Sequence, residues 1–137
     1  MDFNRIKVCA GVLGTAVGSS LGAVLGGWDA LLKALVIFIV LDYISGLIAS
    51  GFEGRLSSRI GFRGVAKKVF ILILVAVAYI IDQLIGANMI RDAVVGFYLG
   101  IEGLSILENA GRVGIPLPAI LKNMLEILKS KKQEQGK

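Results

Sequence analysis

Long stretches with little or no charge constrain the fold of this chain more than any other feature. Residues 8–28 hold no charged side chain, and residues 30–52 and 69–90 are rich in Leu, Ile and Val with few charges. About 20 helical residues, rising 1.5 Å each, cross the roughly 30 Å hydrocarbon core of a bilayer. We therefore expect an all-α integral membrane protein with spans over 30–52 and 69–90, and a candidate, glycine-rich span over 8–28.

The remainder of the chain contains a weaker fourth span and a helix of another kind. Residues 93–111 are apolar but hold Glu102, and we expect a short span there. Because glycine and serine dilute the apolarity of residues 8–28, the sequence leaves three and four spans open. Two prolines within residues 111–118 prevent a continuous helix. Residues 117–137 then place apolar positions at helical spacing opposite lysines, which predicts an amphipathic helix that ends in a basic tail.

The composition excludes most catalytic chemistry. The chain has 137 residues, 55% of them hydrophobic, a mean hydropathy of +0.79, no His and one Cys, Cys9. Histidine triads, His or Cys zinc sites and an internal disulfide are therefore excluded, and we expect no enzyme, no metal and no cofactor. Nucleic acid is a poor partner despite a net charge of +5, because so little of the chain stays in water.

The basic residues are unevenly distributed between the connecting segments. Thirteen of the 15 lie at the N-terminus, in residues 53–68 or from Arg112 onward. The positive-inside bias therefore predicts a multi-pass protein of the cytoplasmic membrane with a basic cytoplasmic loop over 53–68 and a cytoplasmic C-terminus. We expect this loop to contact anionic lipid headgroups through Arg55, Arg59, Arg63, Lys67 and Lys68.

Four glycines, Gly14, Gly18, Gly22 and Gly26, repeat every four residues in the first span and share one helix face. Each costs about 1 kcal/mol of helix stability relative to Ala, so a close-packing neighbour is expected to compensate. This glycine ridge predicts a helix-packing surface, and its partner is either another span of this chain or a second copy. The alternative is that glycine is simply common in membrane helices.

Three acids, Asp42, Asp82 and Glu102, lie inside the expected spans, and we place them at similar depth. Insertion of a charged carboxylate costs roughly 2.5 to 3.5 kcal/mol, and no Lys or Arg is expected at that depth. Each acid is then protonated, hydrogen-bonded across helices, or turned toward water. The sequence leaves open whether the acids line an aqueous path or hold the helices together.

Three sequence blocks resemble a known family when they are taken together. They are residues 41–46 (LDYISG), residues 57–68 (SSRIGFRGVAKK) and residues 102–118 (EGLSILENAGRVGIPLP). Their order and spacing are similar to those of the phage holins that include the toxin-export holins of clostridia. The resemblance implies a bacterial membrane protein that assembles as a homo-oligomer and forms lesions through which an endolysin or toxin passes.

Three functions follow from the residues and the resemblance. The first is a pore-forming, non-enzymatic holin. The second is a small ion channel or transporter subunit that uses Asp42, Asp82 and Glu102. The third is a scaffold that only binds a partner in the membrane. Lesion size separates the first two, because a holin lesion passes protein or collapses the membrane potential, whereas a channel conducts selected ions.

Overall fold

The computed structural model describes residues 2–135, apart from the side chains of residues 125, 128, 129 and 131–135. Residues 136 and 137 of the expected basic tail lie outside the described part. Five helices follow one another, and the described residues contain no strand: α1 Phe3–Leu25, α2 Ala30–Phe52, α3 Ser58–Ile85, α4 Ile90–Arg112 and α5 Ala119–Gln135. The prediction of an all-α protein is confirmed.

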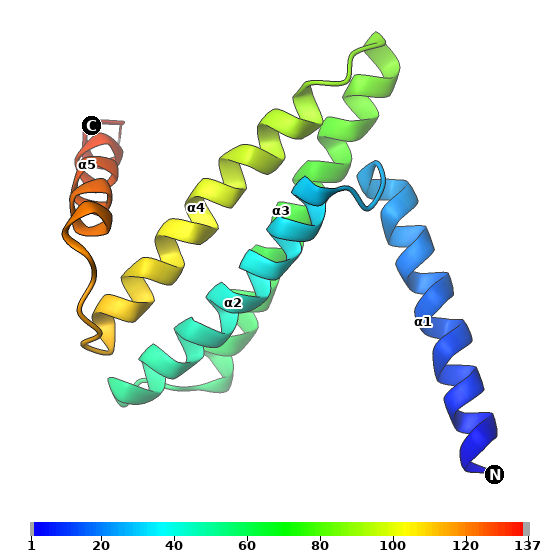
Figure 1. Ribbon diagram of the computed structural model, residues 1–137, viewed down its shortest axis with the longest axis horizontal. Helices are drawn as coiled ribbons and strands as arrows, with labels where there is room; N and C mark the ends of the chain where they lie inside the picture. Colours follow the sequence, from blue (N-terminus) through cyan, green and yellow to red (C-terminus); the bar gives the residue numbers. More distant parts are fainter. Residues whose placement is uncertain (1, 136–137) are drawn as a thin grey trace.

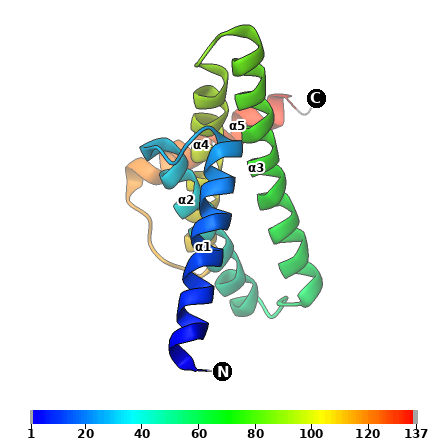
Figure 2. The same cartoon turned by 90° about the vertical axis from the view of Figure 1, so that its right-hand side faces the viewer.

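Helices α2, α3 and α4 form a bundle, and α1 and α5 extend from it (Figure 1). The most extensive packing is between α2 and α4, followed by α3 against α4. Figure 2 shows α3 close to α4 at the hairpin that joins them and farther from the other helices toward its start. α5 has few contacts with α4, and its apolar residues Ile120, Met124 and Ile127 are exposed.

Three helices, α1, α2 and α3, are long and apolar enough to cross a membrane. Large hydrophobic side chains are exposed along each of them. Contiguous apolar surface on this scale is rare on proteins that fold in water, so these faces suit contact with lipid. α4 has 23 residues, more than the 19 expected over 93–111, but unlike α1, α2 and α3 it is not apolar enough to count as a membrane-spanning helix.

The segment expected as a loop over 53–68 is helical from Ser58 onward. The hydroxyl of Ser57 accepts a hydrogen bond from the Ile60 amide and caps α3. Gly61 and Gly64 weaken a helix in isolation, but here they leave room for the ring of Tyr43 from α2, which would lie 3.2–3.4 Å from a Cβ at either position. Tertiary packing therefore extends α3 into the basic segment.

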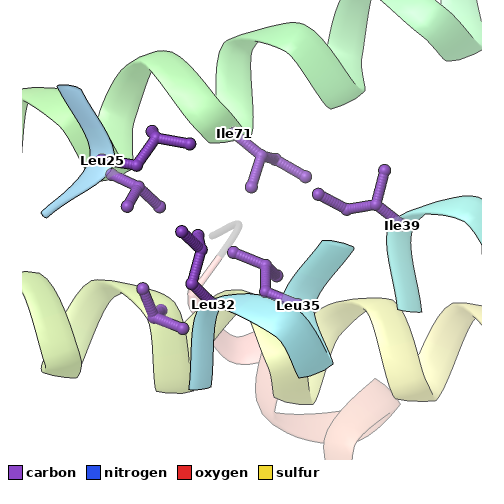
Figure 3. Close-up of a cluster of buried hydrophobic side chains, with 7 residues drawn as sticks. Leu25, Leu32, Leu35, Ile39 and Ile71 are labelled. Atoms are coloured by element: carbon purple, nitrogen blue, oxygen red, sulfur yellow. The ribbon is translucent and has the colours of Figure 1, made fainter. Parts of the chain in front are cut away.

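The hydrophobic core lies where the ends of α1 and α2 meet α3 and α4 (Figure 3). Its buried members come from all four helices: Leu25, Leu32, Leu35, Ile39, Ile71, Val75 and Val95. Because Leu25 belongs to the last turn of α1, this core holds only the end of that helix. Every residue of α1 before Gly18 is exposed, and α1 slants away from α2 (Figure 1).

A sharp turn after α1 determines this arrangement. Gly26 ends the helix with φ +89°, and Gly27 follows with φ +101°, in the left-handed region that favours glycine. A Cβ on Gly26 would lie 2.7 Å from Arg91 Nε and 2.8 Å from Tyr79 Cδ2, whereas one on Gly27 would meet nothing within 4 Å. Gly26 is therefore required both for its backbone conformation and for close packing.

This difference gives a stability prediction. Gly27→Ala should cost about 1–2 kcal/mol because of its backbone conformation alone, and Gly26→Ala should cost more because Arg91 and Tyr79 must also move. Gly14→Ala, in open space inside the helix, should stabilise α1 by up to about 1 kcal/mol. Thermal unfolding of the purified variants in detergent measures the order of their stabilities. Equal losses at Gly26 and Gly27 would contradict the close packing.

Candidate functional site

A buried charge cluster joins the three helices of the bundle. The ammonium of Lys68 on α3 donates to Asp42 Oδ2 on α2 and, at 2.6 Å, to Glu102 Oε2 on α4. The exposed fractions of these side chains are 17% for Lys68, 7% for Asp42 and 3% for Glu102. One lysine therefore connects α3 to both of its neighbours at once.

Asn109 on α4 completes this arrangement, which we call the Lys68 cluster (Asp42, Lys68, Glu102 and Asn109). Its amide donates to Asp42 Oδ1 at 3.0 Å and to Ser45 Oγ at 2.9 Å, and its carbonyl accepts from Arg112 at 3.1 Å. Within the described residues, every buried side-chain nitrogen or oxygen has a partner. Satisfied networks of this kind hold helices in one arrangement, whereas an unpaired buried group is costly.

The expectation that no base lies at the depth of the acids is wrong for Asp42 and Glu102. The sequence predicts Lys68 in a headgroup-binding loop, but it lies nearly three turns inside α3 and faces α2 and α4. Its neighbour Lys67 is exposed. Adjacent helical residues point about 100° apart, so one lysine faces the bundle while the other faces outward.

Asp82 lies apart from the other two acids, so the expectation of a similar depth is wrong for this residue. It belongs to the last turn of α3, and its carboxylate accepts hydrogen bonds from the Ile90 amide at 3.0 Å and the Arg91 amide at 2.8 Å. These amides begin α4 and have no partner inside the helix. Asp82 is therefore an N-terminal cap for α4 and lies outside the Lys68 cluster.

Arg91 forms a second polar centre at the same end of the bundle as Asp82. Its guanidinium donates to the carbonyls of Leu25 at 2.6 Å and Gly27 at 3.0 Å. It also donates to both carboxylate oxygens of Asp29, at 2.6 and 3.2 Å, and to Asp92 at 3.1 Å. We call these contacts the Arg91 clamp. The local sequence pattern around Arg91 does not predict this centre, because nothing in it shows that α1 ends beside Arg91.

The Arg91 clamp lowers the pKa of Asp29, which lies in the turn between α1 and α2. The hydrogen bond from Arg91 holds the pKa of Asp29 below its ordinary value, against a smaller opposing effect of burial. A carboxylate with a lowered pKa stabilises the fold above its ordinary pKa and loses that contribution as the pH falls through the lowered value. The pair of Arg91 and Asp29 therefore contributes to stability at neutral pH and loses that contribution in acid.

The four glycines of the ridge have different surroundings. Gly22 lies under Trp28, whose ring would be 2.5 Å from a Cβ and whose Nε1 donates to the Gly18 carbonyl at 2.8 Å. Gly26 lies outside the helix as its cap, against Arg91. A Cβ on Gly14 or Gly18 would meet nothing within 4 Å. Contacts within the chain therefore account for Gly22 and Gly26 and leave Gly14 and Gly18 open.

The other basic residues of the segment over 53–68 remain on the surface. Arg55, Arg59, Arg63 and Lys67 are all exposed. At the same end of the bundle, Arg112 donates to both carboxylate oxygens of Glu53 at 2.8 and 3.2 Å and lowers the pKa of that carboxyl. This end therefore combines an exposed basic surface with the buried cluster.

The chemistry of these centres suits holding helices in place. The Lys68 cluster pairs its charges, and the Arg91 clamp uses its donors on one turn of the chain. Among the described residues, no group of three or more His, Cys, Asp or Glu side chains is placed to hold a metal ion. The geometry defines a small multi-pass helical membrane protein with an internally paired polar interior.

The chain belongs to the bacteriophage holin family, whose sequence pattern matches residues 19–130. An uncharacterized protein of Listeria monocytogenes is 53% identical over 125 residues, which cover 90% of this chain and 88% of the relative. A 14.9 kDa protein of Clostridium perfringens is 40% identical over 85% of this chain and 90% of its own length. A probable holin of Bacillus phage phi105 is 32% identical over 72% of this chain and 74% of its own length.

No solved structure matches the chain significantly. The family match confirms the resemblance read from the three sequence blocks, and it assigns the chain to a kind of protein that forms pores in membranes rather than to a family of enzymes. The match begins at residue 19, so most of α1 lies before it.

The Lys68 cluster gives a stability prediction with an adjacent control. Lys68→Met leaves two buried carboxyl groups without their cation and should cost about 3–5 kcal/mol, whereas Lys67→Met, at an exposed position, should cost less than about 1 kcal/mol. Thermal unfolding in detergent compares the two variants.

A neutral version of the cluster tests whether charge pairing is the cause. Adding Asp42→Asn and Glu102→Gln to Lys68→Met should recover part of the lost stability, because no charge then remains unpaired. If the triple variant recovered no stability over Lys68→Met, the loss would come from the packing of the missing lysine side chain and not from unpaired charge.

Proposed function

We propose that this chain acts as a holin that assembles with copies of itself in the cytoplasmic membrane of a bacterium and forms lesions there. An endolysin or an exported toxin would then cross the membrane through these lesions. The proposal is supported by membership of the holin family and by the similarity to a probable holin of phage phi105. We further propose that the basic end of the bundle and the C-terminus face the cytoplasm, because 13 of the 15 basic residues then lie on that side.

One structural observation carries the assembly part of this proposal. α1 is a 23-residue apolar helix whose buried residues, Gly22 and Leu25, both lie at its C-terminal end, and every residue before Gly18 is exposed. Gly14 and Gly18 face open space on it. Lipid tails are as apolar as leucine, so helices in a bilayer associate through close backbone approach at small residues. The open part of the glycine ridge therefore supports contact with a second copy.

A selective ion channel is less well supported than a lesion. A channel that uses Asp42 and Glu102 needs carboxylates that face the path of the ion. Both are paired with Lys68, and Asp82 is occupied by the backbone of α4. The acids therefore fit the role of holding helices together better than that of lining an aqueous path.

Inducible expression in bacteria tests the proposed lesion. Production of the chain together with a muralytic enzyme that lacks an export signal should clear the culture abruptly, whereas either protein alone should not. Membrane potential, dye entry and released enzyme activity follow the event. Conduction of selected ions with neither a collapse of the membrane potential nor release of the enzyme would favour a channel over a holin.

The glycine ridge gives a prediction within the same experiment. Gly14→Leu/Gly18→Leu should block close approach of a second helix, so that crosslinked oligomers decrease and lysis is delayed or lost while the chain still accumulates. Ala16→Leu/Ala23→Leu adds comparable apolar bulk to the opposite side of α1 and is the matched control. Equal effects of the two double variants would mean that hydrophobicity, and not the open glycine face, controls assembly.

The orientation is tested by labelling single cysteines in a Cys9→Ser background. Ser57→Cys and Ser130→Cys should resist a membrane-impermeant thiol reagent in intact cells before lysis, because both lie on the proposed cytoplasmic side. Asn88→Cys, in the exposed turn between α3 and α4, should be labelled. Labelling at Ser57 and Ser130 with protection at Asn88 would invert the topology.

A further inference from the structure

A groove runs between α3 and α4 on the outside of the bundle. Toward the basic end it is a cleft of about 960 Å³, and toward the α3–α4 hairpin it continues as a cleft of about 610 Å³. Leu74 and Tyr98 line both clefts, so the two are neighbouring parts of one groove. The Lys68 cluster forms the inner wall of the wider part through Lys68 and Glu102.

The wide end of the groove is positively charged. Arg63 and Lys67 line it, both are exposed, and neither forms an ion pair with any described residue. The charge of Lys68 is already matched by Asp42 and Glu102. Glu108 lies on the opposite wall, one turn before Arg112 on α4. Two cations are therefore free to attract an anion at this end.

The narrow end of the groove has no charged residue. Its α3 wall includes Val77, Ala78 and Ile81, and its α4 wall includes Ala93, Val94 and Phe97. Because α3 is apolar enough to span the membrane, this part of the groove faces the region of lipid tails. The groove is therefore amphipathic along its length, with cations at one end and hydrocarbon at the other.

We propose that this groove binds one anionic phospholipid from the leaflet on the basic side of the membrane. The phosphate lies between Arg63 and Lys67, and one acyl chain lies between α3 and α4 as far as Val77 and Ala78. The ten residues from Lys67 to Val77 rise about 15 Å, which is half of the roughly 30 Å hydrocarbon core and so the depth of one leaflet. Basic pockets between membrane helices are known to suit anionic headgroups.

A lipid fits this groove better than a helix of a second copy does. α1 is the helix with the open face, but it contains no Asp or Glu between Phe3 and Leu25. It could fill the apolar end but would leave Arg63 and Lys67 without an anion. A phospholipid satisfies both ends with one molecule. The proposal depends only on residence in the membrane, so a failure to form lesions would leave it unchanged.

Native mass spectrometry of the full-length protein tests the headgroup. The protein is equilibrated in detergent with equal amounts of phosphatidylglycerol and phosphatidylcholine that carry identical acyl chains. Phosphatidylglycerol should be retained preferentially, and Arg63→Gln/Lys67→Gln should reduce its retention on the order of tenfold. Arg55→Gln/Arg59→Gln removes the same charge from the same segment but outside the groove, and it should retain the lipid.

Photocrosslinking tests the position of the acyl chain. Phosphatidylglycerol with a diazirine in its tail, in vesicles that contain the intact protein, should label peptides that include Val77, Ala78 and Phe97. If Arg63→Gln/Lys67→Gln and Arg55→Gln/Arg59→Gln lost phosphatidylglycerol equally in the mass spectrometry experiment, general surface charge would explain the binding and the proposed site would be overturned. Retention of both lipids alike, or crosslinks from α1 of a second copy to Phe97 in place of lipid, would also overturn it.

Discussion

The pairing of Lys68 with Asp42 and Glu102 is the interaction on which the rest of the bundle depends. In a bilayer the hydrophobic effect does not bring helices together, because lipid tails are as apolar as the side chains that face them. The bundle contains few apolar residues that are fully buried. A hydrogen-bonded ion cluster between three helices therefore specifies their arrangement, since separating them would leave charges unpaired in a medium of low dielectric constant.

The Arg91 clamp has a different consequence, because it holds one end of α1 and leaves the rest free. The guanidinium joins the end of α1, the turn and the start of α4. Every residue of α1 before Gly18 is exposed. One chain therefore contains a bundle with paired internal charges and a separate apolar helix with an open glycine face. This division is consistent with the proposed assembly through α1.

The two polar centres also explain where the acids of the spans are placed. Asp82 completes the hydrogen bonds of a helix end, and Asp42 and Glu102 neutralise a lysine from the basic side. All three carboxylates are therefore already paired within the chain and are not available to a conducted ion. Lys67, next to Lys68 in the sequence, remains available at the mouth of the α3–α4 groove. Adjacent residues of one basic segment thus serve the interior of the bundle and its lipid-facing surface.

The sequence by itself determined the fold class and the family. Runs of apolar residues are local and as long as a bilayer is thick, and the order of three sequence blocks identified the holin family. It did not determine which basic residue faces inward, because Lys67 and Lys68 have the same local surroundings and only the rotation of α3 against α2 and α4 separates them. It also did not separate Gly14 and Gly18 from Gly22 and Gly26, since equal spacing conceals the turn that brings Trp28 and Arg91 against the last two. These outcomes depend on contacts between residues far apart in the chain, such as Lys68 with Glu102 and Arg91 with Asp29, and only the tertiary structure decides them.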